Sequence, residues 1–225
     1  MRIINVLGIS LTDYLLKEAL EKVDIFLRNG ALNTVLYLNT RLMVAAGKDE
    51  SLQTWIEKAD MTVLGDEETL RQSGITTRNR IHEVQEFSFL KEALNIVCRD
   101  HDSLYLVADT QQELKLLEHD IDLLHPGLFI SGQGIFGDDG NINAQTINEI
   151  NDIVPIMIIM RMPYQYEQRL MGDSALINSE LVIGLPDDFN IGNRKESFYD
   201  RFIRRTYQKL LRRLVSEYEK DKNQQ

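Results

Sequence analysis

Short apolar segments rich in β-branched residues alternate with amphipathic helical patterns along most of the chain, and this alternation most strongly constrains the fold. The apolar segments are continuous, which is typical of strands covered on both faces. They lie at 2–7, 34–38, 61–64, 104–108, 128–131, 156–160 and 181–183, and the helical patterns lie at 14–27, 41–59, 87–99, 111–124 and 143–151. We therefore expect an α/β fold, in which residues 1–193 form a single Rossmann-like domain whose mostly parallel sheet is flanked by helices.

The C-terminal segment, residues 194–225, differs from this domain in charge. Acidic residues dominate between 100 and 152, whereas basic residues collect between 194 and 213. Residues 198–218 fit one long amphipathic helix, with arginines on one side and apolar residues on the other. Two interpretations are open for this basic appendage: its arginines are simply solvated, or they meet anionic lipid headgroups or a diphosphate.

Composition and motif spacing exclude several classes of function. A net charge of −10 argues against a nucleic-acid-binding protein. The four histidines and single cysteine show no metal-ligand spacing, so we expect neither a metal nor a cofactor. Gly132-Gln133-Gly134 is a poor dinucleotide loop, because Asp138 and Asp139 would repel a pyrophosphate. With no signal peptide or membrane-spanning segment evident, we expect a cytoplasmic protein.

Small polar residues follow several of the predicted strands. Ligands of parallel α/β sheets bind outside the carboxyl ends of the strands, so Asn39, Thr40 and Asp66 are candidate site residues. Asp66 follows the strand at 61–64 and precedes an acidic segment. An aspartate there is either the N-cap of the next helix or a catalytic base, and the pattern alone leaves both open.

Several segments resemble, in the same order, the WecG/TagA/CpsF glycosyltransferase family. These are Asn5–Ile9, Leu38–Thr40, Ala59–Val63, Arg80, His125–Leu128, Gly134–Phe136 and Met162–Gln165, and the basic C-terminal helix looks like the family's C-terminal appendage. The resemblance implies a bacterial enzyme of cell-wall or surface-polysaccharide synthesis. Such an enzyme transfers a sugar from a nucleotide-sugar donor similar to UDP-N-acetylmannosamine to a lipid-linked diphosphate acceptor.

The chain also departs from the family pattern. The family's Asp-Gly, whose aspartate is the proposed base, stands here as Gly65-Asp66. The family's loop lysine is replaced by Tyr164, so Arg80, Arg161 and the C-terminal arginines are candidate substitutes. Asp187 and Asp188 stand where the family has small residues, and they would oppose a diphosphate unless a cation or an arginine offsets them.

The resemblance implies the following roles. Asp66 is the candidate catalytic base, and the candidate substrate-binding residues are Asn39, Thr40, Arg80, Gln165, Arg201, Arg205 and Arg212. The expected partners are the nucleotide sugar, the lipid-linked diphosphate and the inner face of the cell membrane, with self-association into a homo-oligomer left open. The alternative is a catalytically inactive relative that acts as a binding or scaffolding partner, and a less favoured one is an unrelated small-molecule binding protein.

Overall fold

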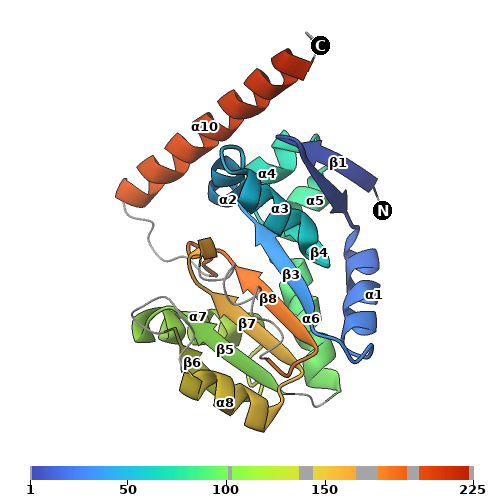
Figure 1. The fold of residues 1–225 in the computed structure, drawn as a ribbon, viewed down its shortest axis with the longest axis vertical. Helices are drawn as coiled ribbons and strands as arrows, with labels where there is room; N and C mark the ends of the chain where they lie inside the picture. The colour runs from blue at the N-terminus through green and yellow to red at the C-terminus, as the bar shows by residue number, and fades with distance from the viewer. Residues whose placement is uncertain (1, 101–102, 137–143, 166–176, 192–197, 223–225) are drawn as a thin grey trace.

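The computed structural model describes residues 2–100, 103–136, 144–165, 177–191 and 198–222. Six strands form one sheet in the order β4-β3-β8-β7-β5-β6, and every neighbouring pair is parallel (Figure 1). The strands are β3 (Asn33–Leu38), β4 (Met61–Leu64), β5 (Leu104–Ala108), β6 (Ile130–Ile135), β7 (Met157–Arg161) and β8 (Leu181–Leu185). The predicted α/β fold with a parallel sheet flanked by helices is confirmed.

One face of the sheet is covered by three long helices, whose apolar sides form the largest core cluster. They are α1 (Leu16–Phe26), α6 (Ser88–Arg99) and α7 (Gln111–Leu124). Helix α6 buries Leu90, Ala93, Leu94 and Val97 at the spacing of a helical stripe. Cys98 follows Val97 in the same helix, and its free thiol is partly exposed.

The other face is covered in two parts. Helices α2 (Thr40–Ala46), α3 (Glu50–Lys58) and α4 (Glu67–Gln72) pack near β3 and β4, and α8 (Ala144–Ile153) packs on the strands at the opposite edge. The helical pattern predicted at 41–59 is divided because Asp49 caps α3 through hydrogen bonds from the amides of Ser51 and Leu52. The polar helix α5 (Arg78–Gln85), which has no fully buried residue, was not predicted.

The first apolar segment forms a hairpin outside the parallel sheet. Strand β1 (Arg2–Val6) pairs antiparallel with β2 (Ile9–Asp13), and Leu7 and Gly8 at the turn have φ values of 55° and 89°. Two left-handed residues in a two-residue turn have the twist that a hairpin requires. The hairpin contributes Ile4, Val6 and Ile9 to the core over α2 and α3.

The glycine-rich segment belongs to strand β6 and does not form a phosphate-binding loop. A Cβ atom at Gly132 would lie 2.4 Å from the Tyr105 ring, and one at Gly134 would lie 2.2 Å from the Thr146 side chain. Both glycines are therefore explained by close packing against β5 and α8. The Asp138-Asp139 segment lies outside the described residues.

The basic appendage contains the 25-residue helix α10 (Phe198–Lys222), which runs along the end of the molecule (Figure 1). Its Leu211 is fully buried among residues of the β1–β2 hairpin and α2. Gly47 allows a close approach there, because a Cβ atom at that position would lie 2.9 Å from Leu7 and 3.5 Å from Leu214. The boundary predicted between residues 193 and 194 lies outside the described residues.

Candidate functional site

Three neighbouring strands, β4, β3 and β8, end at the same edge of the sheet, and each is followed by polar residues. Asn39 and Thr40 follow β3, Asp66 follows β4, and Asp187 and Asp188 follow β8 after one proline. Because parallel strands share one carboxyl edge, these residues are brought together although they are far apart in sequence.

Asp66 is the N-cap of α4, and hydrogen bonds occupy both of its carboxylate oxygens. Oδ1 accepts from the Thr69 amide at 2.7 Å and the Thr40 hydroxyl at 3.0 Å, and Oδ2 accepts from the Thr40 amide at 2.6 Å. The carboxylate therefore joins the turn after β3 to the turn after β4. The cap that the sequence left open is present, and the catalytic role of Asp66 stays a prediction.

The position just before Asp66 has little room for a side chain. A Cβ atom at Gly65 would lie 3.2 Å from the ring of Tyr37 and 3.4 Å from the carbonyl oxygen of Leu38. The Gly65 amide donates to that same carbonyl at 2.8 Å, which holds the turn close to β3. A side chain at position 65, where the resemblance implies an aspartate, would therefore require a small shift of the Tyr37 ring.

Asn39 connects the end of β3 to the loop after β8. Its Oδ1 accepts a hydrogen bond from the Leu42 amide at 2.8 Å and caps α2, while its Nδ2 donates to Asp188 Oδ1 at 2.6 Å. Asn39 is 6% exposed, and its contact with the Leu42 amide is buried, whereas its contact with Asp188 is partly buried. Burial of the carboxyl, together with the charge of Asp187, raises the pKa of Asp188, although the residue as a whole is exposed.

A cavity of about 470 Å³ opens beside Asn39. Its walls come from the ends of β3, β7 and β8, from α2 and from α10, and the polar and aromatic residues that line it include Asn39, Arg41, Lys48, Tyr164, Gln165, Asp187 and Tyr207. A cavity of this volume is in the range that holds a small-molecule ligand. Asn39 and Gln165 thus line the same cavity although they are 126 positions apart in sequence. Residues of one binding site must meet this condition.

A family model described as the glycosyl transferase WecG/TagA/CpsF family matches residues 4–220. The chain belongs to the WecG/TagA/CpsF glycosyltransferase family. No curated protein sequence matches it.

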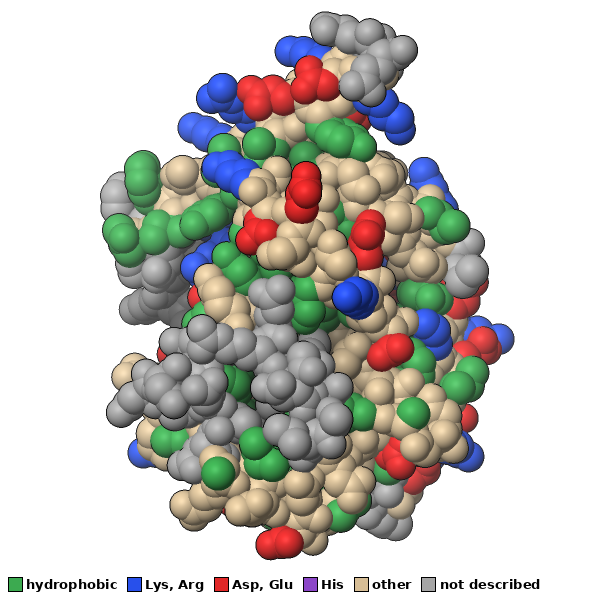
Figure 2. Space-filling model, in the orientation of Figure 1, with side chains coloured by type: hydrophobic (Ala, Val, Ile, Leu, Met, Phe, Trp, Pro, Cys, Tyr) green, Lys and Arg blue, Asp and Glu red, His purple; other side chains and the backbone are tan. Residues whose placement is uncertain are grey.

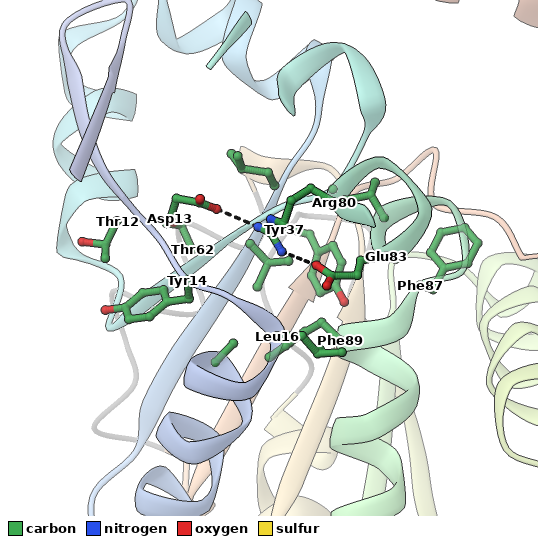
Figure 3. A pocket seen from close by; sticks show the side chains of 15 residues that line it. Thr12, Asp13, Tyr14, Leu16, Tyr37, Thr62, Arg80, Glu83, Phe87 and Phe89 are labelled. Carbon is green, nitrogen blue, oxygen red and sulfur yellow. Dashed lines mark hydrogen bonds and ion pairs between the residues drawn. The ribbon is translucent and has the colours of Figure 1, made fainter. Parts of the chain in front are cut away.

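In this WecG/TagA/CpsF protein Arg80 lies in a different pocket, of about 40 Å³, between β2, β4, α1, α5 and α6 (Figure 3). Its guanidinium contacts Asp13 at 2.6 Å and also pairs with Glu83, and its side chain is only 16% exposed. Figure 3 shows the arginine between these two acids, with aromatic side chains nearby. Arg80 is among the substrate-binding candidates, but two carboxylates already neutralise it and it does not line the cavity beside Asn39.

Arg161, a candidate substitute for the loop lysine, is buried in the protein interior with 1% of its side chain exposed. It contacts Asp120 at 2.8 Å and Glu113 at 2.7 Å, and it also donates to the Phe189 carbonyl at 3.2 Å. Asp120 accepts from the Ile191 amide at 3.3 Å. Arg161 therefore holds the loop after β8 against α7, and its guanidinium is not presented to a ligand.

The C-terminal arginines divide into two groups. Arg212 makes a bidentate pair with Glu68 of α4, at 2.7 and 2.6 Å, whereas Arg201 and Arg205 are exposed near the start of α10. Glu68 is 4% exposed, and its hydrogen bonds from Arg212 lower its pKa. The Arg212–Glu68 pair clamps α10 onto the domain, a role that the sequence did not indicate because Glu68 is 144 positions away.

We expect Glu68→Gln to lower the free energy of unfolding by about 1 kcal/mol at neutral pH, a modest value because Arg212 is more than half exposed. Since the folded-state pKa of Glu68 is lowered, the pair is fully stabilising above the ordinary value of 4.5 and is lost as pH falls through the folded-state pKa. Urea unfolding of both proteins from pH 7 to pH 3 measures this, and the difference between them should shrink on acidification.

Glu217→Gln is the matched control, because Glu217 pairs with Arg213 on the same helix but both side chains are at least half exposed. Its effect should be only a few tenths of a kcal/mol. Equal effects of the two substitutions would contradict the clamp.

Proposed function

We propose that this protein transfers a sugar from a nucleotide-sugar donor, similar to UDP-N-acetylmannosamine, to a lipid-linked diphosphate acceptor. The observation that carries the proposal is the cavity of about 470 Å³, which lies at the carboxyl ends of β3, β7 and β8 and is lined by Asn39 and Gln165. Family membership supports glycosyl transfer as the reaction. In the proposal Asn39 contacts the sugar, Gln165 lines the donor pocket, and Thr40 orients the turn through its bonds to Asp66.

The reaction needs a base that accepts the proton of the acceptor hydroxyl. As the proton leaves, the hydroxyl oxygen bonds to the anomeric carbon, and the bond from that carbon to the diphosphate oxygen breaks with its electron pair on UDP. Asp66 is the base that the resemblance implies, but three donors already bind its oxygens. Asp188 accepts a hydrogen bond from Asn39, and burial of its carboxyl raises its pKa, so we favour Asp188 as the base.

The exposed end of α10 supports a role at a lipid surface. Tyr199 and Phe202 are 68% and 62% exposed, and Arg201 and Arg205 are exposed beside them. Figure 2 shows Lys and Arg side chains gathered along this helix. Aromatic and basic side chains together favour binding to anionic headgroups, and we propose that the helix brings the cavity to the membrane-bound acceptor. Among the described residues no helix is long and apolar enough to cross a membrane.

A catalytically inactive binding protein is the second candidate function, and the geometry at positions 65 and 66 favours it. Position 65 has no carboxylate, and the Asp66 carboxylate is occupied as a cap. In that case the protein would keep the fold and the cavity but would not turn over a nucleotide sugar.

Calorimetry with UDP tests donor binding, which comes before catalysis. We expect the protein to bind UDP with a Kd below about 1 mM, and Gln165→Ala to weaken binding by about 2- to 10-fold through the loss of one neutral hydrogen bond. Gln112→Ala, at an exposed position of α7, is the control and should bind as the wild type does. Absence of binding at millimolar UDP would contradict the transferase proposal.

A further inference from the structure

Arg41, in the first turn of α2, is the arginine of the strand-end cavity. Its guanidinium contacts the Asp187 carboxylate at 3.0 Å and lies 5.6 Å from the centre of the Tyr207 ring of α10. Among the described residues that line the cavity, Arg41 and Lys48 are the basic ones, and both lie on or just after α2. The Arg41 and Asp187 side chains are 40% and 38% exposed, so both are within reach of a ligand in solution.

The ion pair between Arg41 and Asp187 is one that a ligand can replace. Pairs exposed to this degree stabilise proteins little, because water screens them and because two side chains must be ordered. An arginine guanidinium has five donors in a planar fork that matches phosphate oxygens. A diphosphate has more charge and more acceptor oxygens than the single carboxylate of Asp187, and the Tyr207 ring holds the guanidinium near the cavity through a cation–π contact.

The loop after β8 makes such a residue necessary. Asp187 lines the cavity and Asp188 is the next residue of the loop, and their carboxyl groups would repel a diphosphate. Asn39 donates a hydrogen bond to Asp188, but an amide supplies no net charge. Arg41 is the cation in contact with Asp187, so the same side chain that neutralises this acid in the free protein is the one placed to meet an incoming phosphate.

We propose that Arg41 binds the diphosphate group of a substrate, and that Asp187 occupies the Arg41 guanidinium until the diphosphate displaces it. The inference rests on the proposed function, because it assumes that the ligand of the cavity contains a diphosphate. It assigns to Asp187 an inhibitory role in binding: the carboxylate competes with the substrate for one arginine. Lys48 adds positive charge on the same wall.

Two substitutions with opposite effects test this competition by calorimetry with UDP. Arg41→Gln should weaken binding by about 10-fold, as expected for the loss of a charge-assisted contact. Asp187→Asn should tighten binding by about 2- to 5-fold, since the competing ion pair is lost. A folding defect weakens binding and cannot tighten it, so the second variant separates the competition from damage to the fold.

The chain offers a matched control pair on α4. Arg71 and Glu67 form an ion pair with side-chain exposures of 45% and 39%, close to those of Arg41 and Asp187, and neither residue lines the cavity. Arg71→Gln and Glu67→Gln make the same charge changes and should leave UDP binding unchanged. If Arg41→Gln and Arg71→Gln weaken binding equally, the effect is one of overall charge and the inference is overturned.

The source of the diphosphate is distinguished by a second ligand. Farnesyl diphosphate, a soluble isoprenyl diphosphate, stands for the acceptor, and UDP stands for the donor. Loss of affinity in Arg41→Gln for either ligand supports the inference and identifies the substrate that Arg41 holds. If the wild type binds UDP and Arg41→Gln binds both ligands equally well, the inference fails and the proposed function stands. If the wild type binds neither ligand, the proposed function itself fails.

Discussion

Replacing Asp120 by alanine lowers the free energy of unfolding by about 3–5 kcal/mol, the cost expected when one partner of a buried ion pair is removed. Asp120 is fully buried, and it contacts Arg161, which is 1% exposed. The substitution leaves the guanidinium in the interior with Glu113 as its one charged partner among the described residues, and it also removes the acceptor of the Ile191 amide. Urea unfolding followed by circular dichroism measures the loss.

Two further variants show whether the loss of stability comes from the buried charge that Asp120→Ala leaves unpaired. Asp122→Ala, two positions away at an exposed site of α7, should change the free energy of unfolding by less than about 0.5 kcal/mol. The double variant Asp120→Leu with Arg161→Met removes both charges and should recover much of the loss. An Asp120→Ala protein as stable as the wild type would show that the pair does not hold the loop after β8 in place.

Asp188→Asn reduces sugar transfer by about 100- to 10,000-fold, the usual contribution of a general base. The variant keeps an oxygen that can accept the Asn39 amide but cannot take up a proton. Steady-state rates of the wild type and Asp188→Asn at equal donor and acceptor concentrations measure the effect. Unchanged donor affinity in calorimetry would show that the loss lies in the chemical step.

The pH dependence gives a second test of Asp188. Because the pKa of Asp188 is raised above the ordinary 3.8, the transfer rate of the wild type should fall on acidification at a higher pH than for an ordinary aspartate. The raised folded-state pKa also means that ionised Asp188 costs stability, a cost that grows as pH rises from 3.8 through the folded-state pKa. Asp188→Asn removes that cost, so the variant should be at least as stable as the wild type at pH 7.

Asp66→Asn is the comparison that separates the two candidate bases. Because an asparagine amide group would face donors of Thr40 or Thr69, we expect a loss of stability of about 1–3 kcal/mol. If Asp66 only joins the two turns, transfer by the folded variant should fall much less than in Asp188→Asn. The reverse order of the two activities would restore Asp66 as the base.

The core of the fold was predictable because it depends on local patterns. Continuous apolar strands that alternate with amphipathic helices specify a covered parallel sheet. The β1–β2 hairpin was less evident, because its turn uses Leu7 in a left-handed conformation that is unusual for this residue type. The short helix α4 was expected only as the helix that Asp66 would cap, and α5 was missed because it buries no residue and shows no apolar stripe.

Asn39 was a candidate from its position at a strand end, and Gln165 was a candidate from the resemblance. Both line one cavity because each follows a strand that ends at the carboxyl edge of the sheet, and their roles in binding stay predictions. Arg80 and Arg212 lie elsewhere because Asp13 and Glu68, distant in sequence, pair with them. Arg41, which lines the cavity and contacts Asp187, was not among the candidates, although the two acids after β8 indicated that a cation or an arginine would offset them.

A transfer assay tests the proposed function most directly, with the purified protein, a UDP-N-acetylhexosamine donor and a lipid-diphosphate acceptor in vesicles, and with the product identified by mass spectrometry. We expect an acceptor that has gained one sugar residue, formed faster in vesicles with anionic lipid than in neutral ones because of the exposed arginines of α10. Binding of UDP without any transferred sugar, across donors and in both kinds of vesicle, would contradict the transferase proposal and support the inactive binding protein.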